Sequence, residues 1–219
     1  STDPAVTVKA FNQTQKNVNP HPRAPSAVPL ALPGGQFGMP HPLTGIEIQD
    51  LIARFANAAV VSREAGFTGV QIHAAHGYLL HEFLSPLSNQ RQDQYGGSFE
   101  NRTRLVREVV TAIRGVWPES LPLFVRISAT DWVDGGWDIE QSVELSRQLK
   151  PLGVDFMDCS TGGNAAHAKI PVGPGYQAPF AERIRRDAGI LTGAVGLITE
   201  PSQAEQIIAG GQADAVLLA

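Results

Sequence analysis

Residues 70–78 read Val70-Gln71-Ile72-His73-Ala74-Ala75-His76-Gly77-Tyr78. The β-branched run at the start of this stretch predicts a buried strand, and two imidazoles and a phenol follow it. In α/β folds the carboxyl ends of the parallel strands are where sites are built. We therefore expect His73, His76 and Tyr78 to lie together at such an edge, where they can hold a carbonyl oxygen and deliver a proton.

The residues before this stretch predict a helix. Apolar side chains recur at helical spacing from Ile48 to Arg63, and Thr44 followed by Glu47 forms a capping-box pattern. Gly66 then interrupts the pattern at a position suited to left-handed backbone. Helix, glycine turn and strand in this order are half of a βαβ unit.

The same succession of helix, glycine turn and strand recurs further along the chain. Helical patterns run through glycine into apolar strands at residues 145–158 and 204–218, and residues 121–127 and 190–195 are further strand candidates. The predicted strands begin near residues 69, 122, 154, 190 and 214. Each is a near-continuous apolar run, as expected for parallel strands covered on both faces. The predicted class is α/β with right-handed crossovers.

Length and composition agree with this class. A chain of 219 residues with 42% hydrophobic residues can bury one sizeable core, and a net charge of −4 gives no reason to expect nucleic acid or an anionic membrane as a partner. Cys159 is the single cysteine, so we expect no disulfide and a cytoplasmic location. No run of 18 apolar residues is present, which favours a soluble protein.

The first part of the chain differs from the rest. Residues 1–43 hold most of the irregular composition and show no sustained periodicity, so we interpret them as an extended loop region with a possible strand remnant at Val6 to Ala10. Such a loop either has a function and covers the open end of a barrel, or is the start of a truncated domain. Residues 44–219 form the second predicted unit.

Further motifs follow in order between residues 24 and 219. They are Ile72 to Leu80, Phe83 to Pro86, Asn89 to Arg91, Asp93 to Ser98, Glu100 to Arg102, Val125 to Ser128, Gly173 to Gln177 and Thr192 to Thr199. Together they resemble the old yellow enzyme family of flavin-dependent ene reductases, most closely its bacterial xenobiotic reductase branch. The resemblance implies an FMN-bearing (β/α)₈ TIM barrel that reduces activated C=C bonds or nitro compounds with electrons from NADH or NADPH.

The resemblance also assigns roles to the opening stretch. His73 and His76 would bind the carbonyl or nitro oxygen of a small-molecule substrate, and Tyr78 would protonate the α-carbon. Hydride transfer to the β-carbon places negative charge on that oxygen, and losing one donor in comparable sites costs about 2.7–4 kcal/mol. A phenol of pKa ~10 keeps its proton at neutral pH and can still pass it to a basic carbon.

Three residues are candidate FMN ligands. Arg126 lies in an otherwise apolar strand, where an arginine is costly unless it meets an anion or a ring; the resemblance places it by the flavin pyrimidine, and an internal salt bridge with Asp131 or Asp158 is the alternative. Gly196 and, more weakly, Ser160 are phosphate candidates, because a glycine pair at a strand end lets backbone N–H groups approach an anion. An ordinary turn is the other interpretation.

Other side chains have structural interpretations. The histidine pair, with His81, has the residue types of a zinc site, but its first histidine ends a strand rather than lying on a helix face, so we expect no metal. Either histidine of the pair would otherwise be a satisfied core residue. Residues 93–102 predict a polar loop before a helix at Leu105 to Val116, with Glu100 and Arg102 pairing locally. Trp132, Trp137 and Tyr176 either line a pocket mouth or pack loops, and Cys159 is expected to be an inert packing thiol.

The chain also departs from the family pattern. Eight strands close such a barrel, but only the last five have counterparts here, and the chain stops at Leu217-Leu218-Ala219 where family members continue into a phosphate-binding Gly-Arg. We therefore expect a barrel truncated at both ends, with two unpaired edge strands, weak FMN affinity and a tendency to form homo-oligomers. A catalytically silent barrel fragment is the alternative function, and an FMN barrel of the α-hydroxy-acid oxidase or dihydroorotate dehydrogenase type fits the strand pattern but not the histidine cluster.

Overall fold

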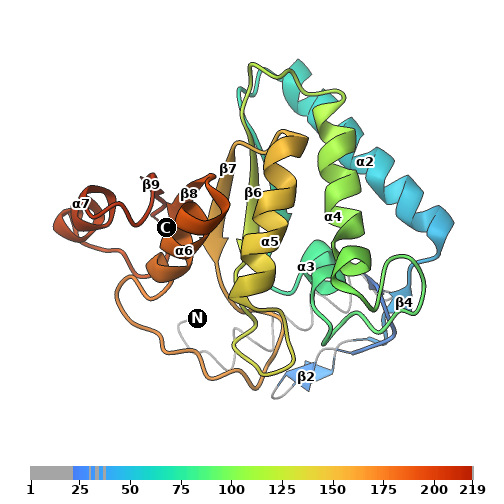
Figure 1. Cartoon of the computed structure of the whole chain (residues 1–219). Coiled ribbons are helices and arrows are strands. Elements are labelled where there is room, and N and C mark those ends of the chain that lie inside the picture. The colour runs from blue at the N-terminus through green and yellow to red at the C-terminus, as the bar shows by residue number, and fades with distance from the viewer. Residues whose placement is uncertain (1–21, 30, 33–34, 37, 219) are drawn as a thin grey trace.

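A computed structural model describes residues 22–29, 31–32, 35–36 and 38–218 of the chain. Its main feature is a parallel sheet of five strands in the order β5-β6-β7-β8-β9 (Figure 1). The strands are β5 (Val70–Ala74), β6 (Leu123–Ser128), β7 (Phe156–Ser160), β8 (Leu191–Ala194) and β9 (Ala215–Val216). Every predicted strand is therefore present, and the α/β class is confirmed. The possible strand at Val6 to Ala10 lies outside the described residues.

A helix occurs in every connection between neighbouring strands of this sheet. The helices are α2 (Gly45–Glu64) before β5, α3 (Leu79–Leu84) and α4 (Phe99–Arg114) before β6, α5 (Ile139–Leu149) with the 3₁₀ turn η1 (Lys150–Leu152) before β7, α6 (Ala178–Ala188) before β8 and α7 (Pro201–Ala209) before β9. This is the repeating βα pattern of parallel sheets. In the part of the chain that the structure describes, no helix combines the length and apolarity that a membrane span requires.

Helix α2 begins with the predicted capping box. The Thr44 hydroxyl accepts a hydrogen bond from the Glu47 N–H, and the Glu47 carboxylate accepts from the Thr44 N–H at 2.9 Å. The hydrogen bonds that the Thr44 N–H and the Thr44 hydroxyl donate to the carboxylate lower the pKa of Glu47 to about 2. Gly66, with a φ of +87°, takes the predicted left-handed position just after the helix.

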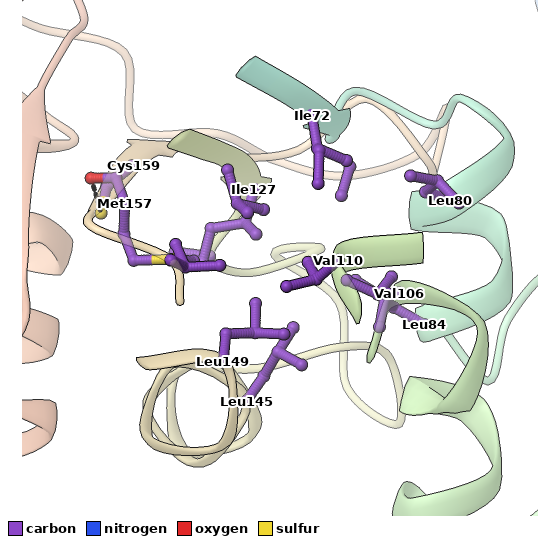
Figure 2. Packing of buried hydrophobic residues seen from close by; sticks show 14 of the residues in the cluster. Ile72, Leu80, Leu84, Val106, Val110, Ile127, Leu145, Leu149, Met157 and Cys159 are labelled. Atoms are coloured by element: carbon purple, nitrogen blue, oxygen red, sulfur yellow. Dashed lines mark hydrogen bonds between the residues drawn. The ribbon is translucent and has the colours of Figure 1, made fainter. Parts of the chain in front are cut away.

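One face of the sheet packs against the helices and forms the core. Figure 2 shows Ile72, Ile127, Met157 and Cys159 of the strands facing Val106 and Val110 of α4 and Leu145 and Leu149 of α5. Cys159 is fully buried, and burial raises the pKa of its thiol. Both observations agree with the packing role predicted for this residue.

The other face of the sheet carries the polar side chains. His73, Arg126, Asp158 and Gly193 are register partners on four adjacent strands, so they form one row across this face. Gln71 and His73 are exposed in β5. The strands were predicted to be covered on both faces, but within the described ranges the helices pack against one face and the polar row lies on the other (Figure 1).

Two local predictions were wrong. Helix α4 begins at Phe99 rather than Leu105, because the Ser98 side chain caps it by accepting from the Asn101 N–H, and its first turns are polar. Arg102 does not bind Glu100. Its guanidinium donates to the carbonyls of Leu84 at 2.8 Å and Gly97 at 2.5 Å, which fixes the loop before the helix.

Short strands lie before α2. β1 (Arg23–Ala24) pairs in parallel with β4 (His41–Pro42), and β2 (Ala31–Leu32) pairs antiparallel with β3 (Gly35–Gln36). The Arg91 guanidinium donates to the carbonyls of Pro25 at 2.9 Å and Leu43 at 2.7 Å and so ties this segment to the loop after α3. In Figure 1 the segment lies at the lower end of the molecule, as do the loops that follow β6 and β7.

Candidate active site at the carboxyl end of β5

The turn after β5 carries the histidine and tyrosine side chains. His73 lies in the strand, and the chain then takes left-handed backbone at His76, with a φ of +60°, and at Gly77, with a φ of +73°. Tyr78 is the N-cap residue of α3. Positive φ at a residue other than glycine is uncommon and occurs where surrounding contacts enforce it.

The turn brings the three predicted catalytic side chains together. The ring centroids of His73 and His76 lie 5.2 Å apart, and those of His73 and Tyr78 lie 5.3 Å apart. Tyr78 is 59% exposed and His73 is also exposed, so both can reach a ligand. The clustering predicted from the sequence is present.

Contacts from β6 and from the loop after β7 fix this turn. The His76 N–H donates to Ser128 Oγ at 2.9 Å, and that hydroxyl donates to the Gly162 carbonyl at 2.7 Å. The backbones of Gly77 and Gly163 are in such close contact that a Cβ on Gly163 would lie 2.5 Å from the Cα of His76. The Ser128 side chain at the end of β6 and the glycine backbone of the loop after β7 therefore fix the backbone of His76.

His81 also holds the turn after β5 in place. It is fully buried, its Nδ1 accepts a hydrogen bond from the Gly77 N–H at 2.9 Å, and its Nε2 lies 3.0 Å from Asp131 Oδ1. The other Asp131 oxygen accepts from Ser85 Oγ at 2.6 Å and from the Trp137 N–H at 2.8 Å. His81 is thus engaged within the protein, and among the described residues no group of three His, Cys, Asp or Glu side chains could hold a metal.

Two of the three aromatic side chains named from the sequence, Trp132 and Trp137, follow the second of the alternatives left open and pack loops. Trp137 is fully buried, and its indole N–H donates to Ser142 Oγ at 2.7 Å, so it packs a loop. Trp132 packs edge-on against Phe180 at 5.2 Å between ring centroids. These tryptophans support the loops around the site.

Both histidines of the cluster are neutral at pH 7. Burial, followed by the nearby Arg126 charge and His73, lowers the pKa of His76 to about 4. Burial and Arg126 also lower the pKa of His73. A neutral imidazole has one N–H donor and one acceptor nitrogen, so each ring can offer one hydrogen bond to a substrate oxygen.

Arg126 lies beside His73 on the polar face of the sheet. Its Nε is 3.4 Å from Asp158 Oδ2, which also accepts from Gln71 Nε2 at 2.9 Å. The salt bridge considered as an alternative for Arg126 is therefore present. Burial raises the pKa of the fully buried Asp158, against the opposing effects of Gln71 and Arg126.

The salt bridge with Asp158 leaves part of the Arg126 side chain able to contact a ligand. The Arg126 side chain remains 27% exposed, and a guanidinium has five N–H donors. A positively charged, partly exposed side chain in an otherwise apolar strand fits the electron-rich pyrimidine edge of a flavin. The residues present are thus compatible with FMN on this face.

The two phosphate candidates occupy different surroundings. Ser160 Oγ lies 2.6 Å from His76 Nε2 and 3.3 Å from Gln177 Oε1, so the structure places it beside the histidine cluster. Gly196, with a φ of +116°, follows β8, and a Cβ there would lie 2.7 Å from Gln177 Nε2 and 2.9 Å from the Tyr176 ring. Packing against Gln177 and Tyr176 alone requires a glycine at this position.

Sequence reasoning missed three supporting residues. Ser128 and His81 hold the turn after β5, and Gln177 links Thr161 to the Val195 carbonyl, accepting at 2.6 Å and donating at 3.1 Å. Ser128 and His81 had a signal in the sequence, since a polar residue at the end of an apolar strand or inside a buried helix needs a partner, whereas Gln177, the N-cap residue of α6, had none. The identity of that partner depended on the tertiary structure.

Comparison with known proteins identifies the family. The model of the NADH:flavin oxidoreductase / NADH oxidase family matches residues 8–219. The chain belongs to this family. Its members include the old yellow enzymes, so the resemblance seen in the sequence motifs is confirmed.

Individual members of the NADH:flavin oxidoreductase family support this. NADPH dehydrogenase of Geobacillus sp. (strain WCH70) is 51% identical over 196 residues, which are 90% of this chain and 56% of that relative. The chain thus spans about half the length of the curated relatives it matches.

Solved structures give the same result. A complex of 2-naphthoyl-CoA reductase with 2-naphthoyl-CoA has a TM-score of 0.82 at 27% identity, covering 90% of this chain and 31% of that one. The old yellow enzyme homologue from Zymomonas mobilis has a TM-score of 0.72 at 27% identity, covering 93% of this chain and 58% of that one. The parallel sheet is therefore part of a TIM barrel, as predicted.

Proposed function

We propose that this chain carries the substrate-binding and proton-donating side chains of an FMN-dependent ene reductase that uses NADPH. The observation that carries the proposal is the convergence of His73, His76 and Tyr78 at the carboxyl end of β5, on the strand next to Arg126. Barrels of this type build their sites at that end of the strands. The name of the Geobacillus relative favours NADPH over NADH as the electron donor.

In this proposal His73 and His76 bind the substrate. Each neutral ring donates one N–H to the carbonyl or nitro oxygen of an activated alkene or nitro compound, where negative charge develops during reduction. Because Ser128 and Ser160 hold His76 before substrate arrives, little reorganisation of that ring is needed. A neutral pair also avoids protonating the oxygen outright and leaves the proton transfer to another group.

Tyr78 is the proposed proton donor. Its phenol lies beside His73 and is accessible, so it can reach the α-carbon of a substrate held by the two imidazoles. Bound FMN supplies the hydride that the β-carbon receives. Transfer of the Tyr78 proton to the α-carbon completes the saturated product, and solvent can return a proton to the exposed phenolate.

Arg126 and Gly196 are the proposed FMN ligands. The exposed part of the Arg126 guanidinium would hold the pyrimidine edge and favour the anionic reduced flavin, with Asp158 orienting it. Backbone N–H groups near Gly196 are the proposed phosphate contact, because Gly196 lies in the loop after β8, where barrels of this type often bind phosphate. The substrate is a small molecule. The edge strands β5 and β9 also favour self-association.

The test is to titrate the purified 219-residue chain with FMN and then to follow NADPH-driven reduction of 2-cyclohexen-1-one in excess FMN. We expect weak but saturable FMN binding and enone-dependent NADPH oxidation that the His73→Ala/His76→Ala variant lacks. If the wild-type chain binds no FMN and performs no reduction at any FMN concentration, it is a silent barrel fragment and the proposal fails.

A further inference from the structure

His76 is held by two serines that are neighbours in the sheet. Ser128 and Ser160 are register partners at the ends of β6 and β7. Ser128 Oγ accepts from the backbone N–H of His76 at 2.9 Å, and Ser160 Oγ lies 2.6 Å from the ring nitrogen Nε2. One serine therefore fixes the backbone of this residue and the other contacts its ring.

The ring contact determines what His76 can do. A neutral imidazole has a single N–H. If that hydrogen is on Nε2, it is donated to Ser160, and Nδ1 offers a lone pair that repels a negatively charged oxygen. If the hydrogen is on Nδ1, then Nε2 accepts from the Ser160 hydroxyl and the Nδ1–H is available to a substrate. Only the second arrangement leaves His76 with an N–H that is not already donated to Ser160.

The surroundings of Ser160 favour the second arrangement. Its hydroxyl has one hydrogen and two acceptors within reach, His76 Nε2 at 2.6 Å and Gln177 Oε1 at 3.3 Å. The shorter contact is the stronger one. Gln177 Oε1 already accepts from Thr161 Oγ1 at 2.6 Å, so it does not need the Ser160 hydrogen.

We propose that Ser160 is a positioning residue whose hydroxyl donates to His76 Nε2 and thereby keeps the ring hydrogen on Nδ1, the nitrogen that donates to the substrate oxygen. This inference rests on the proposed function and refines it. It gives Ser160 a role that excludes donation to the FMN phosphate, because its single hydrogen is used on His76. Ser160 is 5% exposed, so water competes little for that hydrogen.

The test reads the tautomer directly, without activity. The full chain is labelled with ¹⁵N-histidine, and two-bond ¹H–¹⁵N spectra at pH 7.5 show which ring nitrogen of each histidine carries hydrogen. The His76 signals are assigned from their loss in His76→Gln. We expect His76 to be protonated on Nδ1 in the wild-type chain. Protonation on Nε2 would overturn the proposal whatever the variants do.

Variants then test whether Ser160 is the cause. In Ser160→Ala we expect His76 to lose the pure Nδ1–H pattern and to show Nε2–H or a mixture, whereas Ser160→Thr keeps the hydroxyl and should restore the pattern. Ser146→Ala is the matched control, since that serine is also buried but donates within α5 to the Ser142 carbonyl at 2.7 Å. An unchanged tautomer in a folded Ser160→Ala chain would refute the role of Ser160. A chain that binds no FMN could still show the predicted tautomer, so the two proposals fail separately.

Discussion

The substitution Gly163→Ala should displace the turn after β5, which carries His76. Gly163 has a φ of +94°, and a Cβ there would lie 2.5 Å from the Cα of His76, whereas ordinary contact begins at 3.4 Å. The turn after β5 must therefore retreat by about 0.9 Å, which is the difference between 3.4 and 2.5 Å. A misplacement of about 1 Å at a site can cost roughly 10²-fold in rate.

The stability cost of Gly163→Ala has two parts. Left-handed backbone costs a residue with a Cβ about 1–2 kcal/mol, and overpacking against fixed backbone adds about 1–3 kcal/mol. Gly66→Ala is the control for the first part, because Gly66 has a φ of +87° and a Cβ added to it would meet no atom within 4 Å. Urea denaturation should thus show a loss of about 2–5 kcal/mol for Gly163→Ala and about 1–2 kcal/mol for Gly66→Ala.

The ring signals of His76 provide the second readout for this prediction. They should shift in the ¹H–¹⁵N spectrum of Gly163→Ala and stay in place in Gly66→Ala. Equal destabilisation by the two substitutions, together with unmoved His76 signals, would show that the loop after β7 does not hold the turn and would refute this reasoning.

Three further predictions concern single residues. Tyr78→Phe should slow substrate reduction in stopped-flow measurements of the FMN-loaded chain and spare reduction of the flavin by NADPH; equal rates for wild type and variant would remove its proton-donor role. Arg126→Gln should weaken FMN binding at least tenfold by fluorescence titration, whereas Arg186→Gln on the outer surface should not change it, and equal affinities would contradict the assignment. Because the pKa of His76 is lowered from 6.5 to about 4, its contribution to stability is complete above pH 6.5 and is lost as the pH falls toward 4. The denaturation midpoint of wild type relative to His76→Gln should therefore fall over that range, and a constant difference would count against the buried, neutral ring.

The strands were predictable because a short, near-continuous apolar run is buried in an α/β core whichever strand it pairs with, so its own composition is a sufficient signal. Val70 to Ile72 and the run before Cys159 are apolar enough to be strands in any α/β context, and Thr44 with Glu47 caps a helix by purely local bonds. The start of α4 was missed for the opposite reason. Its first turns are polar, so periodicity gave no signal, and only the Ser98 cap marks the true beginning.

The sequence was sufficient to predict the side chains of the candidate site, but not the residues that hold them in place. The spacing of His73, His76 and Tyr78 along one turn brings the rings together once the strand ends at Ala74. The contact between Ser160 and His76 joins residues 84 positions apart and depends on the parallel register of β5, β6 and β7. No local pattern specifies such a register, so the sequence alone could not show that Ser160 contacts His76.

Phenol affinity measures most directly whether the two imidazoles donate to one oxygen. In the FMN-loaded chain a phenolate oxygen should bind between His73 and His76 and produce a long-wavelength charge-transfer band. Because a hydrogen bond to a charged group contributes about 1.5–3 kcal/mol, His73→Ala and His76→Ala should each weaken phenol binding at least tenfold. Wild-type phenol affinity in either single variant would contradict the account.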